Sequence, residues 1–184
     1  MKRPLIVGLG YQMQTGKDTI ASYLILHGSA SYPFKRIAFA DPLKDAAAAI
    51  FGFDRSRLDD ADYKAEVDPY WGVTRRTILQ KLGTECLRKG YADDVWIRAA
   101  KRRVEAALEA GRSVVLPDVR FINEVEAVRS WGGVVWRVKR DAAPVHAHVS
   151  ELELNGYAFD GVVENNGTME ELYRQVDALL GAFS

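Results

Sequence analysis

The stretch Gly8-Leu-Gly-Tyr-Gln-Met-Gln-Thr-Gly-Lys17-Asp-Thr19 decides the fold of this 184-residue chain. It follows an apolar run, residues 4–8, that predicts a buried strand, and it leads into residues 18–26, whose apolar side chains have helical spacing. A loop between a strand and a helix points backbone N–H groups and the positive end of the helix at an anion, and a lysine there reaches terminal phosphates. The stretch therefore predicts a nucleotide phosphate site.

The loop departs from the strict phosphate-loop pattern, which is Gly, four residues, then Gly-Lys-Ser/Thr. Tyr11 stands in place of the first glycine, and Asp18 stands in place of the hydroxyl residue, which Thr19 can replace. The alternative is a glycine-rich turn with a surface lysine, but the surrounding alternation of strands and helices favours the phosphate site. The candidate loop residues are Gly10, Gln14, Thr15, Gly16, Lys17, Asp18 and Thr19.

Strand and helix patterns alternate along the whole chain, which predicts a single α/β domain, residues 1–184, with a mainly parallel five-stranded sheet. Strands are expected at 4–8, 36–40, 113–117, 134–138 and 161–164. Helices are expected at 18–26, 41–50, 74–89, 94–110 and 121–131, and after the capping box of residues 168–171, with Met169 facing inward. Residues 53–72 are polar and poorly periodic, which predicts a loop or mobile segment, and residues 140–157 also look irregular.

The composition limits the possible functions. The chain has 25 Lys and Arg residues and 25 Asp and Glu residues, and a net charge of zero argues against a protein that binds nucleic acid duplexes. The single cysteine, Cys86, excludes an internal disulfide and is predicted to lie in the core. The longest apolar run, residues 46–51, is far shorter than the roughly 20 residues that span a bilayer. We therefore expect a soluble protein of the cytoplasm with no membrane partner.

Short motifs in a fixed order resemble the phage deoxynucleoside monophosphate kinases, within the phosphate-loop nucleotide kinase superfamily. The motifs, which extend over nearly the whole chain, are Gly16-Lys-Asp-Thr19, Phe39-Ala-Asp-Pro-Leu-Lys44, Arg76-Thr-Ile-Leu-Gln-Lys-Leu-Gly-Thr-Glu85, Trp96, Leu116-Pro-Asp-Val-Arg120, Asn123-Glu124, Gly132-Gly133, His148-Val-Ser-Glu151 and Asn165-Asn-Gly-Thr168. Each motif alone is a weak signal, and the loop around Tyr11 departs most from the family.

The resemblance implies an enzyme that moves the γ-phosphoryl group of ATP, with Mg²⁺, onto a deoxynucleoside monophosphate. It implies a three-layer fold with a helical acceptor-binding region at about 42–93 and a basic lid at about 140–157. It also implies small nucleotides as partners, a monomer or homodimer, and the host cytoplasm as location if a phage encodes the chain.

Charged residues at strand ends are the candidates for chemistry. Lys17 is expected to bridge the β- and γ-phosphates. Asp118 follows an apolar strand and is expected to hold Mg²⁺ through water, with Asp18 and Thr19 as further metal-side residues; the alternative for Asp118 is an ion pair with Arg120. If the strand continues, Arg120 shares the side of Asp118 and is expected to grip the acceptor phosphate.

The acceptor-side candidates follow the second strand. Asp41 and Lys44 are expected to bind or deprotonate the acceptor, although Asp41 is also a candidate helix cap. Arg76 and Gln80 are four residues apart and share a helix face, which suits contacts to phosphate and base; the alternative is a solvated face.

The remaining candidates lie in the second half of the chain. Among the cations that leave the fourth strand, Arg140 is favoured as a lid residue, against a solvated charge run. His148 and Glu151 match a family motif either as a lid-anchoring pair or as catalytic residues. Asn165 and Asn166 lie where related kinases bind adenine, or form a turn before the last helix.

Two other functions are compatible with these residues. One is a related small-molecule kinase, such as a dephospho-coenzyme A kinase, which the segment from Asn165 to Thr168 also fits. The other is a non-catalytic binding module gated by a nucleotide. The chain lacks the Asn-Lys-x-Asp motif that reads guanine, which argues against a GTPase switch.

Overall fold

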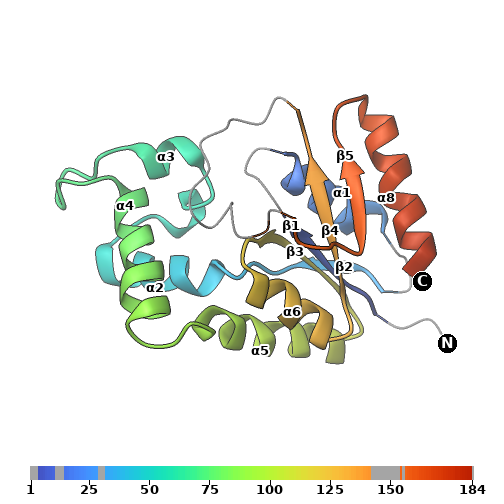
Figure 1. Cartoon of the computed structure of the whole chain (residues 1–184). Coiled ribbons are helices and arrows are strands. Elements are labelled where there is room, and N and C mark those ends of the chain that lie inside the picture. Colours follow the sequence, from blue (N-terminus) through green and yellow to red (C-terminus); the bar gives the residue numbers. More distant parts are fainter. Residues whose placement is uncertain (1–3, 11–14, 29–31, 142–153, 155, 184) are drawn as a thin grey trace. The chain divides into compact units, whose positions relative to one another are not determined.

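The computed structural model describes residues 4–10, 15–28, 32–141, 154 and 156–183 (Figure 1). The chain divides into two compact units. The sheet unit comprises Met1–Ala38 and Lys101–Ser184, and the helical unit comprises Phe39–Ala100. The acceptor-binding region expected at about 42–93 falls within the helical unit, whereas most of the expected lid lies outside the described residues.

The sheet unit contains a five-stranded sheet in which every neighbouring pair is parallel, as the sequence predicts. The strands are β1 Ile6–Gly10, β2 Phe34–Arg36, β3 Ser113–Val119, β4 Val134–Lys139 and β5 Gly161–Glu164, in the spatial order β2-β3-β1-β4-β5. β1 continues two residues beyond the predicted end, so Gly10, expected in the loop, is its last residue. β2 instead ends at Arg36, where its pairing with β3 stops.

Helices cover both faces of this sheet (Figure 1). α1, Lys17–His27, and α8, Met169–Phe183, contact each other and bury Ile20, Leu24, Leu172 and Val176 against one face. α6, Ile122–Ser130, packs against β1 and β4, and α5, Val95–Glu109, leads into β3. The main core of the unit thus lies between the sheet and the pair α1 and α8.

The predicted capping box opens α8. The Glu171 backbone N–H donates to the Thr168 hydroxyl at 3.2 Å, and the Thr168 N–H donates to the Glu171 carboxylate at 2.8 Å. Met169, predicted to face inward, is 48% exposed. A helical side chain covers the turn that precedes it, and Met169, as the first helical residue, has no such turn.

The helical unit begins with α2, Asp41–Phe51, which ends at Gly52 in the left-handed conformation. A 3₁₀ helix η1, Arg55–Arg57, and the short α3, Ala61–Ala65, follow. The prediction of a loop or mobile segment at 53–72 is therefore wrong for much of its length. Phe53, Leu58 and Tyr63 are buried and form the second core with α2 and the next helix. Their wide spacing along the chain hides this core from a periodicity analysis.

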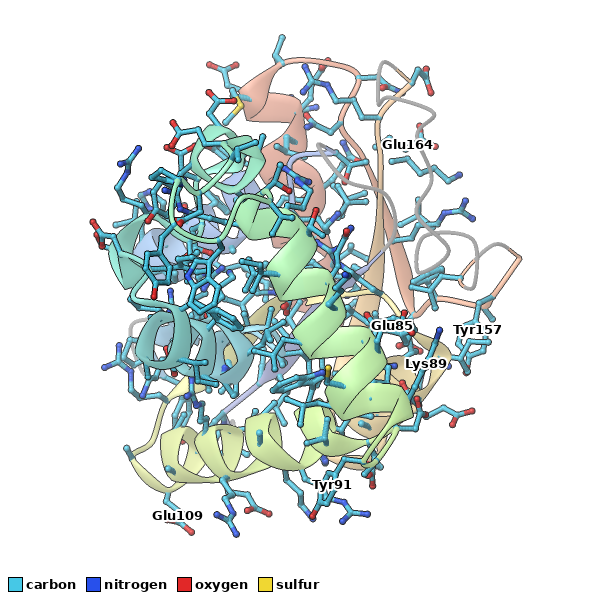
Figure 2. The ribbon with its side chains drawn as sticks, turned by 90° about the vertical axis from the view of Figure 1, so that its left-hand side faces the viewer. Glu85, Lys89, Tyr91, Glu109, Tyr157 and Glu164 are labelled. Atoms are coloured by element: carbon cyan, nitrogen blue, oxygen red, sulfur yellow. The ribbon has the colours of Figure 1, made fainter. Side chains whose placement is uncertain are left out.

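The predicted helix at 74–89 has two parts, α4 Arg75–Gln80 and the π-helical η2 Lys81–Lys89, which form one continuous ribbon (Figure 2). Ile78 and Leu79 are buried as expected, but Cys86 is exposed, so its placement in the core is wrong. A π-helix has more residues per turn than the 3.6 assumed in the prediction, and this rotates later residues off the buried face. Gly83 takes the buried position instead, against Leu43.

No helix in the described ranges combines the length and the apolar character needed to cross a membrane.

Candidate functional site

The candidate phosphate loop connects β1 to α1. Tyr11 and Gln14 lie outside the described residues. Thr15 is fully buried, and Gly16, at the N-terminal cap of α1, has a φ of 98°. A left-handed backbone at this point is readily available only to glycine. The Ile20 N–H donates to the Gly16 carbonyl at 3.1 Å, so the helix begins here and its first N–H groups have no intrahelical partner, as an anion site requires.

The charged residues of this loop lie at the start of α1. The Lys17 ammonium group donates to the Thr15 hydroxyl at 3.5 Å, so this cation points back over the loop. Asp18 is exposed and Thr19 is half-buried in the same helical turn. The loop therefore combines a helix N-terminus, a cation and a hydroxyl group within five residues, a set that suits a phosphate chain.

The end of β3 lies directly beside the end of β1. Gly8 pairs with Leu116 and Gly10 with Val119, so β3 holds one extra residue there, a bulge that contains Pro117. Proline has no N–H to donate, which suits an interruption of the ladder. Asp118, half-buried, follows at once, next to the strand that leads into the phosphate loop.

Arg120 lies beyond the end of β3, because the strand stops at Val119. The alternation that would place its side chain beside that of Asp118 therefore does not apply. Its backbone N–H donates to the Glu124 carboxylate at 2.8 Å, and the Phe121 N–H donates to the same oxygen at 3.2 Å. Glu124, which is only 3% exposed, thus fixes the turn that presents Arg120.

β4 delivers the cations that were considered for the lid. Arg137 pairs with Gly10 in the sheet, and its guanidinium lies 5.9 Å from the centre of the Phe159 ring. Lys139 lies 3.9 Å from Glu164 on the neighbouring strand. Arg140, which is exposed, follows the strand. His148 and Glu151 lie outside the described residues.

The loop after β5 contacts two other segments through its asparagines. The Asn165 side-chain amide donates to the Thr15 carbonyl at 2.9 Å, and the Asn165 N–H donates to the Lys139 carbonyl at 2.8 Å. The Asn166 side-chain oxygen accepts from the Asp141 N–H at 2.9 Å. Both amides therefore bind the protein itself, and adenine binding by this loop remains a prediction.

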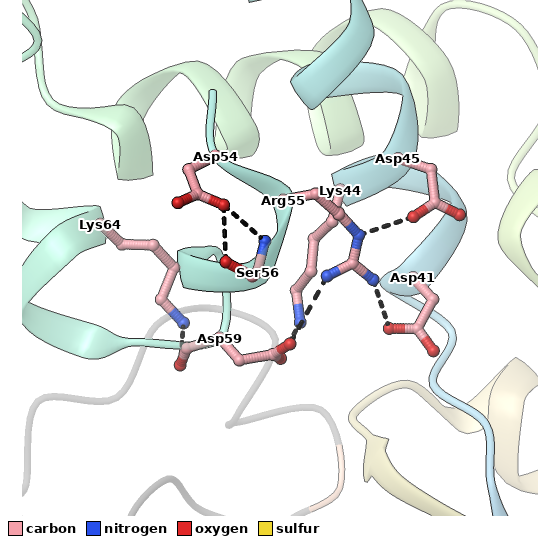
Figure 3. A network of polar contacts seen from close by, with 8 residues as sticks. All are labelled: Asp41, Lys44, Asp45, Asp54, Arg55, Ser56, Asp59 and Lys64. Carbon is pink, nitrogen blue, oxygen red and sulfur yellow. Dashed lines mark hydrogen bonds and ion pairs between the residues drawn. The ribbon is translucent and has the colours of Figure 1, made fainter. Parts of the chain in front are cut away.

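In the helical unit, the acceptor candidates Asp41 and Lys44 belong to a network of ion pairs (Figure 3). The Lys44 ammonium lies 2.5 Å from Asp59. Arg55 lies 3.1 Å from Asp41, 2.6 Å from Asp45 and 3.5 Å from Asp59. Burial lowers the pKa of Arg55, but the hydrogen bond to Asp45 and the charges of the three aspartates outweigh it and raise that pKa. Ser56 donates to Asp54 and lowers the pKa of that carboxyl.

The expectation that Asp41 caps its helix is wrong. Ala40 is the N-cap residue, and Asp41 is the first residue of α2, followed by Pro42. An acid in the first turn still suits the helix dipole. Its carboxylate is directed to Arg55, a residue that we did not select from the sequence because its segment carried no periodic pattern.

The other acceptor candidates lie on α4. Arg76 donates to the Ala61 carbonyl at 3.3 Å and is half-buried, while Gln80 is exposed at the last residue of α4. The adjacent Arg75 is buried and faces the core: its guanidinium stacks 4.0 Å from the centre of the Tyr63 ring and pairs with Glu66 and Asp68. Arg75 and Arg76 thus have different surroundings, in agreement with the expectation that Arg76 lies on the helix face of Gln80.

Comparison with known proteins identifies the family of this chain. A family model described as deoxynucleotide monophosphate kinase matches residues 55–176, more than half of the chain. The chain belongs to the deoxynucleotide monophosphate kinase family. The expectation of a phosphotransferase is thereby confirmed, and the non-catalytic alternative is not supported. The match begins after the phosphate loop, so the assignment of that loop rests on its own geometry.

Relatives of this kinase occur in large viruses and phages. A relative from Acanthamoeba polyphaga mimivirus is 32% identical over 191 residues, which cover 94% of each chain. The deoxynucleotide monophosphate kinase of Enterobacteria phage T4 is 24% identical over 144 residues, and that of Escherichia phage RB69 is 26% identical over 133 residues. The matches cover 72% and 68% of the kinase but only 59% and 54% of these two phage proteins.

Among solved structures, the kinase resembles the APS kinase CysC of Mycobacterium tuberculosis, solved as a Cys-to-Ala mutant. The TM-score is 0.50 at 12% identity, and the likeness covers 98% of this chain and 99% of the other. At this identity the likeness shows the fold alone, and it confirms the expected α/β fold.

Two residues of the kinase gain importance from the structure. Glu124 belongs to the motif Asn123-Glu124, to which we assigned no role from the sequence. An acidic residue within an otherwise buried helix pattern was the feature that could have identified it. Arg55 had no signal except the density of aspartates around it in the sequence. A groove of about 490 Å³ also lies beside the loop after β5, lined in part by Asn166, Glu171 and Arg174.

Proposed function

We propose that this kinase transfers the γ-phosphoryl group of ATP to a deoxynucleoside monophosphate, which yields the diphosphate and ADP. Family membership supports the acceptor class. The geometry at the start of α1 supports the donor: Gly16 adopts a left-handed conformation at the helix N-terminus, and Lys17 points back over the loop. That arrangement is the observation that carries the proposal, because it matches a nucleotide phosphate chain in both charge and hydrogen bonding.

The sheet unit is proposed to hold the donor. Lys17 would neutralise the β- and γ-phosphates, while backbone N–H groups at the start of α1 bind their oxygens. Arg140 is proposed to balance charge that develops on the transferred group, and Arg120 to grip the acceptor phosphate in a bidentate manner. The reaction then needs alignment and charge neutralisation and no covalent enzyme intermediate.

The residues of the sheet unit fit Mg²⁺ better than a metal bound by protein alone. In the described part of the chain, no three His, Cys, Asp or Glu side chains gather in a way that could hold a metal. Mg²⁺ commonly keeps several waters and binds through one or two protein oxygens plus substrate phosphates. Asp118, Thr19 and Asp18 are the residues proposed to hold it. When bound, Mg²⁺ neutralises phosphate charge during transfer.

The helical unit is proposed to bind the monophosphate through Asp41, Lys44, Arg76 and Gln80. Lys44 is already paired with Asp59, so an acceptor phosphate would have to replace that carboxylate. Asp41 is paired with Arg55 at 3.1 Å, and we assign it an anchoring role at the acceptor site.

An assay of ADP release tests this function directly. The full chain with Mg²⁺ and ATP is offered each of the four common deoxynucleoside monophosphates, and diphosphate product is identified by chromatography. We expect turnover with at least one of them. If the chain binds ATP yet turns over none of the four, the proposed acceptor class is wrong. Turnover of dephospho-coenzyme A alone would favour the alternative kinase.

A further inference from the structure

In the described part of the chain, the Asn165 side chain joins the loop after β5 to the phosphate loop. The Asn165 amide donates to the carbonyl of Thr15, 150 residues away in sequence, at 2.9 Å. Asn165 is itself held by its backbone, whose N–H donates to the Lys139 carbonyl at the end of β4. The sheet therefore fixes Asn165, and Asn165 in turn fixes the carbonyl of a fully buried residue of the phosphate loop.

The same side chain lies against Gly16. A Cβ atom built on Gly16 would collide with the Asn165 amide nitrogen, so this glycine is needed for close approach as well as for its φ of 98°. Asn165 thus touches both residues of the peptide that joins Thr15 to Gly16. The hydrogen bond to Thr15 and the close approach to Gly16, both from the Asn165 amide nitrogen, limit rotation of this peptide.

The orientation of that peptide has a consequence for anion binding. In a planar trans peptide the C=O and the following N–H point in opposite directions. With the Thr15 carbonyl directed at Asn165, the Gly16 N–H is directed away from Asn165. A peptide flip would reverse both groups and present a carbonyl oxygen, which repels phosphate, where an N–H donor had been.

We propose that Asn165 is a positioning residue of the phosphate loop, which locks the Thr15–Gly16 peptide so that its N–H is available to the phosphates of the donor. This inference rests on the proposed function, because it assumes that the loop binds a polyphosphate. It differs from a contact between Asn165 and the adenine base. The positioning role requires only phosphate in the ligand, whereas a base contact requires the base.

Two matched variants separate these roles. Asn165→Leu replaces the amide by an apolar group of similar size. Gln175→Met makes the same kind of change at an amide that bonds both backbone groups of Glu164, the residue directly before Asn165. Within the described residues this amide has no bond to the phosphate loop. Asn165→Ala serves as a second variant if leucine prevents folding, and thermal unfolding verifies the fold of each protein.

Titration calorimetry with ATP and, separately, with inorganic tripolyphosphate measures the effect. We expect Asn165→Leu to weaken both ligands about tenfold, because a hydrogen bond that orients a donor is lost. Gln175→Met should bind both like the parent chain. The ratio of kcat/KM for ATP to that for GTP should stay the same in Asn165→Leu.

Three other results have different meanings. Weaker ATP binding with unchanged tripolyphosphate binding, or a changed ratio of ATP to GTP, would overturn the positioning role in favour of a base contact. Unchanged binding of both ligands by Asn165→Leu and Asn165→Ala would overturn it entirely, with the proposed function intact. A parent chain that binds neither ligand would contradict the proposed function itself.

Discussion

The sheet unit holds its candidate residues mainly through backbone geometry, whereas the helical unit holds them through ion pairs. In the sheet unit, Gly16 is placed by its left-handed conformation, Asp118 by a strand end, and Arg120 by a turn that Glu124 caps. In the helical unit, Asp41 and Lys44 are placed by Arg55 and Asp59. These are two different ways to prepare a site for a phosphate.

The difference follows from what each unit is proposed to bind. Backbone N–H groups that the fold holds in one orientation form a site that is ready before the ligand arrives. Paired side chains neutralise one another in the absence of ligand and have to exchange partners when it binds. We therefore expect the donor site to depend on individual groups in the loop, and the acceptor site to depend on the network as a whole.

Loss of Lys17 should have the largest effect. Lys17→Ala removes the cation that lies over the phosphate loop, and we expect kcat/KM to fall by at least about 100-fold, as for other single groups that stabilise developing charge. Steady-state assays with saturating acceptor measure it. The thermal unfolding temperature should stay close to that of the parent chain, because Lys17 is not part of the buried core and its contact with Thr15 is a long one, 3.5 Å. If Lys17→Ala keeps full activity, the assignment of Lys17 to the donor site is wrong.

A smaller effect, on stability, is expected from Arg75. Arg75→Met leaves Asp68, whose side chain is 14% exposed, without this partner and removes the stacking on Tyr63. We expect a loss of about 2–3 kcal/mol of unfolding free energy in the helical unit. Hydrogen exchange of residues 53–79 measures it locally. The matched control is Arg98→Met, where an exposed pair with Asp94 is worth about 0.5 kcal/mol or less.

The smallest and most specific effect is expected from Arg55. Arg55→Ala leaves Asp41, Asp45 and Asp59 without this cation, so Asp59 no longer divides its charge between Arg55 and Lys44. Asp59 should then hold Lys44 more firmly and raise the KM for the monophosphate about tenfold. Arg55→Lys should lower this KM part of the way to the parent value, because lysine restores the positive charge. The recovery should be incomplete, because an ammonium group cannot contact the aspartates as a planar guanidinium does.

Initial rates with each substrate varied in turn separate the two sites for these Arg55 variants. The KM for ATP should change less than about twofold, as an effect confined to the acceptor implies. Equal increases in the KM values for ATP and for the monophosphate would show that the ion-pair network affects both substrates. The proposed difference between the donor site and the acceptor site would then be wrong.

The sequence predicted elements well where a local pattern carries the information. Four of the five strands, the start of α1 and the capping box of α8 lie close to the expected places, because burial on both faces and helix caps leave clear marks in residue order. β2 overlaps its predicted range only at Arg36. The phosphate loop could be proposed despite two departures from the strict motif, because its setting between a strand and a helix is also local.

Predictions failed where distant residues decide the outcome. Cys86 is exposed because η2 is π-helical, and residues 53–65 are ordered because Phe53, Leu58 and Tyr63 pack against α2 and α4. Asp41 binds Arg55, 14 residues away, instead of capping its helix. No window of neighbouring residues contains these partners.

The sequence by itself thus determined the order of elements and the family resemblance, since each depends on residues close together in the chain or on motifs in a fixed order. Only the tertiary structure decided which groups meet. The Asn165 amide lies on Thr15 because β1, β4 and β5 are neighbours in a parallel sheet, whose carboxyl ends form one edge. Strand pairing, which joins residues far apart in sequence, is the physical reason for that contact.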